Sequence, residues 1–69
     1  MKLYVLEGTI NGQPMSPRSF LSRKDAEKRL SEILTWRDLQ VEDDRKPSKH
    51  TEEFVCNQYT RFFIRRVIA

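Results

Sequence analysis

Residues 59–68, Tyr-Thr-Arg-Phe-Phe-Ile-Arg-Arg-Val-Ile, decide the fold more than any other stretch of this chain. Aromatic and β-branched side chains dominate the stretch, which predicts a β-strand. Side chains alternate between the two faces of a strand. The apolar residues therefore divide into two sets: Phe62, Ile64 and Ile68 on one face, and Phe63 and Val67 on the other. A strand that is apolar on both faces is normally covered on both faces.

Residues 2–10 form a second strand of the same kind. Its apolar residues also divide into two sets: Tyr4, Leu6 and Ile10 on one face, and Leu3 and Val5 on the other. Asn11-Gly12 follows and predicts a tight type I′ hairpin turn, because both central residues of that turn need a positive φ. The returning strand, residues 13–21, contains two prolines and is therefore expected at an edge of the sheet.

A helix is predicted over residues 23–35, with Ser22 as its N-cap. Its apolar side chains recur at helical spacing on one face: Ala26, Leu30, Ile33 and Leu34. We expect the helix to loosen between Trp36 and Leu39, because continuing the pattern would bury Arg37. Residues 42–53 are polar and charged and predict a loop, either mobile or ordered. Residues 54–56 have the composition of a short additional strand.

Together these elements predict an α+β fold in one domain, residues 1–69. A small antiparallel sheet of three strands, with a short fourth as an option, carries one helix on one face, in the order β-β-α-(β)-β. The last strand pairs antiparallel with the first, which gives the sheet order 2-1-3.

One helix covers one face of a sheet, so the second face would leave apolar side chains in water: Leu3, Val5, Phe63 and Val67, with Phe20 as a candidate fifth. A contiguous apolar patch indicates an interface. The favoured interpretation is a second protein layer, most simply a second copy of the chain, with Arg61 and Arg65 at the edge of the patch. The alternative is that residues 42–58 fold back over this face and cover it with Phe54, Val55 and Tyr59.

Composition limits the function classes. The chain has 69 residues, 38% hydrophobic and 33% charged, a net charge of +3 and a mean hydropathy of −0.70. One cysteine and one histidine exclude a disulfide framework and the common zinc motifs. His50 and Cys56 lack the context of a catalytic pair, and so small a chain encloses a large pocket with difficulty. We therefore expect a protein that is not an enzyme and that binds no cofactor, metal or membrane. Because a free thiol fits a reducing compartment, we expect the protein to be cytoplasmic.

The sequence favours a small, basic, non-enzymatic protein–protein interaction module that forms a homodimer or docks on a protein partner. Trp36 is a further candidate for partner contact, although it could instead cap the core. The layout of hairpin, capped helix and basic last strand is similar to that of small accessory proteins of bacteria and their phages. That resemblance implies an accessory or inhibitory role.

Nucleic-acid binding is the alternative function. Residues of the last strand combine aromatic rings with arginines, as in sheet surfaces that hold single strands: Tyr59, Arg61, Phe63 and Arg65, with Lys2 as a further cation. The competing explanation is that these arginines keep a strand soluble.

Overall fold

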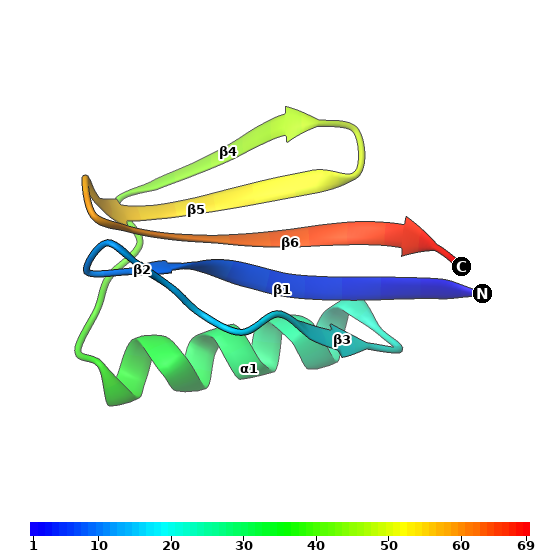
Figure 1. The fold of residues 1–69 in the computed structure, drawn as a ribbon, viewed down its shortest axis with the longest axis horizontal. Coiled ribbons are helices and arrows are strands. Elements are labelled where there is room, and N and C mark those ends of the chain that lie inside the picture. The colour runs from blue at the N-terminus through cyan, green and yellow to red at the C-terminus, as the bar shows by residue number, and fades with distance from the viewer.

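The computed structural model describes residues 1–69 as one antiparallel sheet with a single helix packed on one face (Figure 1). Two long strands, β1 (Lys2–Ile10) and β6 (Thr60–Ile68), pair along their length at the centre. The other elements are β2 (Gln13–Pro14), β3 (Arg18–Phe20), α1 (Arg23–Trp36), β4 (Asp43–Ser48) and β5 (Thr51–Asn57). The sheet order is β2-β1-β6-β5-β4, and β3 also pairs with β1.

The α+β fold and the antiparallel pairing of the first and last strands are confirmed. The predicted number of strands is wrong, because the sheet has six. Residues 42–53, predicted as a loop, instead contribute β4 and the start of β5, which form a hairpin. The composition was misleading because β4 is an edge strand whose residues are all exposed. Charged side chains remain hydrated in such a strand.

The predicted hairpin turn at Asn11-Gly12 is present, with φ angles of 51° and 81°. Two hydrogen bonds attach this turn to the start of β6. The backbone N–H of Asn11 donates to Oγ1 of Thr60 at 3.0 Å, and that of Gly12 donates to the carbonyl of Tyr59 at 2.8 Å. Thr60 is fully buried, so the bond to Asn11 satisfies a hydroxyl that would otherwise lack a partner.

Helix α1 begins after Ser22, whose Oγ accepts a hydrogen bond from the backbone N–H of Asp25 at 3.1 Å. This confirms the predicted N-cap. The helix ends at Trp36, and Asp38 adopts a positive φ of 54°. The chain therefore leaves the helix where continuing it would have buried Arg37.

We expect Ser22→Ala to lower the free energy of unfolding by about 1 kcal/mol, because it removes the side-chain acceptor of the first helical turn. Ser31→Ala is the matched control, since Ser31 is exposed within the same helix. Urea denaturation followed by circular dichroism measures both. An equal loss in the two variants would contradict the capping role.

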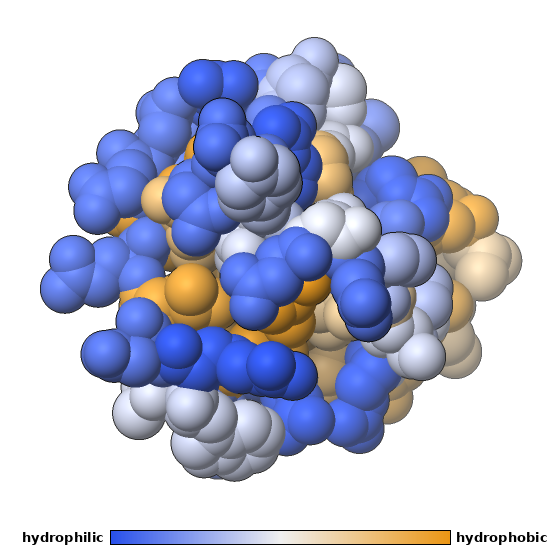
Figure 2. Space-filling view, turned by 60° about the vertical axis from the view of Figure 1, so that its left-hand side comes forward, coloured by the Kyte–Doolittle hydropathy of each residue, from blue (hydrophilic) through white to orange (hydrophobic).

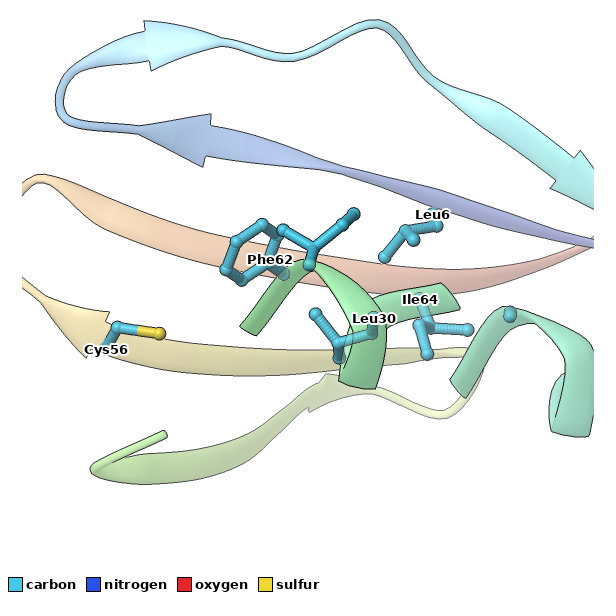
Figure 3. Close-up of a cluster of buried hydrophobic side chains, with 7 residues drawn as sticks. Leu6, Leu30, Cys56, Phe62 and Ile64 are labelled. Atoms are coloured by element: carbon cyan, nitrogen blue, oxygen red, sulfur yellow. The ribbon is translucent and has the colours of Figure 1, made fainter. Parts of the chain in front are cut away.

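The core lies between α1 and the facing side of the sheet (Figure 3). Leu6, Phe62 and Ile64 are fully buried and converge on Leu30 of the helix. The two predicted apolar faces are therefore assigned: the set containing Leu6 and Phe62 faces the helix. Other buried hydrophobic residues complete the core: Ala26, Ile33 and Cys56.

Phe20 was the candidate fifth member of the uncovered patch, and that placement is wrong. It lies opposite Tyr4 in the β1–β3 pairing and packs against the core. Its side of the strand follows from the register, which sequence periodicity alone leaves undefined. Apolar residues nevertheless reach the surface elsewhere, as orange patches between blue polar side chains in Figure 2 show.

Candidate functional site

The face of the sheet opposite α1 carries no second layer (Figure 1). We call it the open face. Cross-strand pairs of β1 and β6 form its centre: Leu3 with Val67, Val5 with Arg65, Glu7 with Phe63, and Thr9 with Arg61. Strand β5 adds Glu53, opposite Phe63, and Val55, opposite Arg61. The structure thus brings together the residues proposed as an interface: Leu3, Val5, Phe63, Val67, Arg61 and Arg65.

Both arginines of the open face are paired with glutamates. Arg65 donates from Nε and Nη2 to Oε2 of Glu7, at 3.2 and 2.9 Å. Arg61 donates from Nη1 to Oε2 of Glu53 at 3.0 Å. The open face therefore presents two Arg–Glu pairs, each with one positive and one negative side chain, rather than a continuous positive surface.

Phe63 lies between these two pairs, with Glu7 opposite it on β1 and Glu53 opposite it on β5. Glu53 is only 7% exposed although it lies on the uncovered side of the sheet. A hollow of about 200 Å³ adjoins the Phe63 ring and is lined by Glu7, Thr51 and Arg65 as well. The centre of the open face is thus an aromatic ring with fixed charged neighbours.

Glu7 and Glu53 belong to this surface, although neither was predicted there. Glu7 could have been found, since period two places it on the same side as Leu3 and Val5. Glu53 could not, because its segment was predicted as a loop. Its position opposite Phe63 depends on the β5–β6 register.

The alternative cover for this face does not form in the structure. Residues 42–58 extend the sheet sideways instead of folding over it. Phe54 packs against the core, and Val55 lies on the open face as part of the sheet. Tyr59 lies in the β5–β6 turn and is 62% exposed.

The residues proposed to contact nucleic acid are not gathered on one surface. Arg61, Phe63 and Arg65 share the open face, but Tyr59 precedes β6. Lys2 lies opposite Ile68, on the side of the sheet that α1 covers. Period two already places Lys2 on the other face from Leu3 and Val5, whereas the exclusion of Tyr59 depends on β6 starting at Thr60.

Trp36 is 66% exposed at the end of α1, so it does not cap the core. The guanidinium of Arg29 lies 5.0 Å from the centre of its ring, a distance suited to a cation–π contact. Because α1 lies on the other side of the sheet, Trp36 and the open face are separate surfaces.

The only thiol and the only imidazole of the chain lie apart. Cys56 is buried in the core, and this burial raises the pKa of its thiol, to which the charge of Glu42 adds. His50 lies in the β4–β5 turn. The structure has no group of three or more His, Cys, Asp or Glu side chains placed to bind a metal ion. Its 14-residue helix is too short and too polar to cross a membrane.

Comparison of the chain with protein-family models, with curated proteins and with solved structures finds no match. No function is therefore transferred from another protein. The surfaces described above provide the basis for a proposal.

Proposed function

We propose that this chain is a non-enzymatic interaction module that pairs with a second copy of itself through the open face. The observation that carries the proposal is Phe63, which lies at the centre of an uncovered sheet face between two Arg–Glu pairs. Uncovered apolar area of this kind is typical of interfaces. A second copy would supply the missing layer, as in proteins that pack two sheets face to face.

Charge favours a second copy over a partner of one charge sign. The centre of the open face carries two arginines and two glutamates, so its charge is balanced. In a twofold dimer, if one residue of the first copy contacts a different residue of the second, the reverse contact also forms. An arginine of one copy can then face Glu7 of the other, whereas a partner of one charge sign would meet like charge at one member of each Arg–Glu pair.

Size gives a second reason for self-association. Only nine of the 69 residues are buried, so the core provides little stabilisation for a chain of this length. The single cysteine excludes a stabilising disulfide within the chain. Domains below about 70–80 residues commonly gain the missing stability from such a crosslink, a metal or oligomerisation.

Nucleic-acid binding through the last strand is less well supported. A phosphate that approached Arg61 or Arg65 would meet the carboxylate of Glu53 or Glu7 beside each guanidinium, which offsets its positive charge. Under the dimer proposal we expect no retardation of single-stranded DNA or RNA by this face at about 50 mM salt.

Light scattering coupled to size-exclusion chromatography tests the dimer. We expect the wild type at twice the 8.3 kDa chain mass and Phe63→Arg at the monomer mass. A central aromatic anchor is typically worth about 2 kcal/mol or more, so the dissociation constant should rise roughly 30-fold or more. Arginine is preferable to glutamate here, because Glu7 and Glu53 can pair with it and keep the monomer folded.

Leu21→Arg is the matched control. Leu21 is 72% exposed and lies between β3 and α1, away from the open face, so this variant should remain dimeric. A monomeric wild type at every concentration up to about 1 mM would overturn the proposal. So would a Phe63→Arg variant that keeps the mass of the dimer.

A further inference from the structure

A second surface lies on the helix side of the sheet. A hollow of about 230 Å³ is lined by residues from the start of α1 and from the β4–β5 turn. Figure 1 shows these two segments at its right-hand end. Four of its lining residues are cationic: Arg23, Lys46, Lys49 and Arg66. Elements far apart in the sequence supply these side chains, so the fold gathers positive charge that is dispersed along the chain.

Three of these four cations have no carboxylate partner. The ion pairs of the structure include Arg23, Arg29, Arg45, Arg61 and Arg65, but neither Lys46, Lys49 nor Arg66. The open face differs from the hollow, because both of its arginines, Arg61 and Arg65, donate to a glutamate. Unpaired cations around one concave site favour an anionic ligand.

Arg66 is held in place by the turn that closes the hollow. Its backbone N–H donates to the carbonyl of His50 at 2.8 Å, and its Nη2 lies 2.5 Å from Nδ1 of the same residue. Because a guanidinium only donates, Nδ1 is the acceptor in this contact. Nε of Arg66 is enclosed without a hydrogen-bond partner. The protein therefore leaves one donor of Arg66 unpaired, and a ligand can reach this side chain only through its terminal nitrogens.

The one acidic residue lining the hollow is paired with one of its four cations. Glu52 forms an ion pair with Arg23 across the space between α1 and β5. The neighbouring carboxyl group of Asp44, together with burial, raises the pKa of Glu52, while Arg23 and Lys46 act in the opposite direction. Glu52 therefore fixes Arg23 at one side of the hollow, and the remaining cations face it from the other elements. Ser48 and Thr51 add hydroxyl donors.

We propose that this hollow binds the diphosphate group of a small ligand. The volume is below the range of about 300–1,000 Å³ typical of sites that enclose drug-sized molecules, which suits a compact anion. Three unpaired cations match an anion that carries several negative charges. An extended nucleic-acid strand is a poorer fit, because the neighbouring β4 begins with Asp43 and Asp44 and offers no continuous basic path.

Isothermal titration of the full chain with inorganic pyrophosphate tests the site. We expect saturable binding with a dissociation constant below about 1 mM at low salt, and weaker binding of sulfate at equal ionic strength. Lys49→Glu should weaken pyrophosphate binding at least tenfold. Lys24→Glu makes the same charge change on an exposed helical residue outside the hollow and should alter affinity less than threefold.

Several results would overturn the proposal. Absence of saturable binding, or equal affinity for sulfate, would reduce the hollow to a general anion-attracting surface. If the two lysine variants lost equal affinity for pyrophosphate, the net charge of the protein, rather than the hollow, would account for the binding. Tighter binding of single-stranded DNA than of pyrophosphate would assign the site to a nucleic-acid backbone. If Lys49→Glu loses its circular dichroism spectrum, Arg66→Gln takes its place with the same expected loss. Thr51 is the one residue that lines both this hollow and the hollow beside Phe63, and neither Lys49 nor Arg66 belongs to the open face, so pyrophosphate binding and the mass of the dimer are measured separately.

Discussion

Phe62→Ala is expected to bring this protein close to its unfolding midpoint at 25 °C. Phe62 is fully buried and packs with Leu6, Leu30 and Ile64 at the centre of the core (Figure 3). Removing a buried phenylalanine side chain costs about 3–5 kcal/mol, through lost burial and the cavity that remains. Domains are stable by roughly 0.05–0.15 kcal/mol per residue, so a loss of that size removes a large part of the total here.

The neighbouring residue provides the matched control. Phe63 has the same side chain on the same strand, but it lies half-buried on the open face. Phe63→Ala should therefore lower the free energy of unfolding of the monomer by less than half as much. Urea denaturation at a concentration where light scattering shows only monomer compares the two variants directly. Equal losses would mean that the open face is part of the folding core.

Gly8→Ala is expected to be the second most damaging change, although it adds only one methyl group. A Cβ at this position would lie 2.3 Å from the carbonyl oxygen of Arg61 and 2.9 Å from Cα of Phe62. Both are backbone atoms of the central partner strand, so β1 and β6 would have to separate. We expect a loss of about 3 kcal/mol, at the upper end of the usual cost of overpacking.

Gly12 is the only other glycine and serves as its control. It has a positive φ of 81°, but nothing lies within 4 Å of a Cβ built there. Gly12→Ala should therefore cost only the strain of a left-handed residue, about 1–2 kcal/mol. Thermal unfolding monitored by circular dichroism ranks the two variants. A larger loss for Gly12→Ala would show that the turn, rather than the close contact of β1 with β6, limits stability.

Local chemistry explains which features could be predicted from sequence. The positive φ angles of Asn11 and Gly12 follow from the type I′ turn that this dipeptide favours. The bond of Ser22 to the first helical turn follows from its preference for the N-cap. The two faces of β1 and β6 follow from period two, once each segment is recognised as a strand. None of these inferences requires knowledge of a distant partner.

The β4–β5 hairpin shows where sequence reasoning was insufficient. Residues 43–48 contain two aspartates, two basic residues and a proline, which is a loop composition. They form a strand because β5 provides an edge to pair with, and both faces of β4 remain in water. Such pairing depends on the tertiary position of β5, so the composition of β4 did not reveal it.

Neighbouring residues are enough to specify the α+β class, the apolar faces of the two long strands, the first turn and the helix cap. The distribution of charge, in contrast, depends on which strands pair and in which register. Glu7 and Arg65 are 58 positions apart in the chain and meet because β1 and β6 pair in one register. Arg66, one residue further on, faces the other side of the sheet and meets His50. A shift of one residue in register would exchange the two faces, so pairing across the sheet separates the balanced open face from the basic hollow.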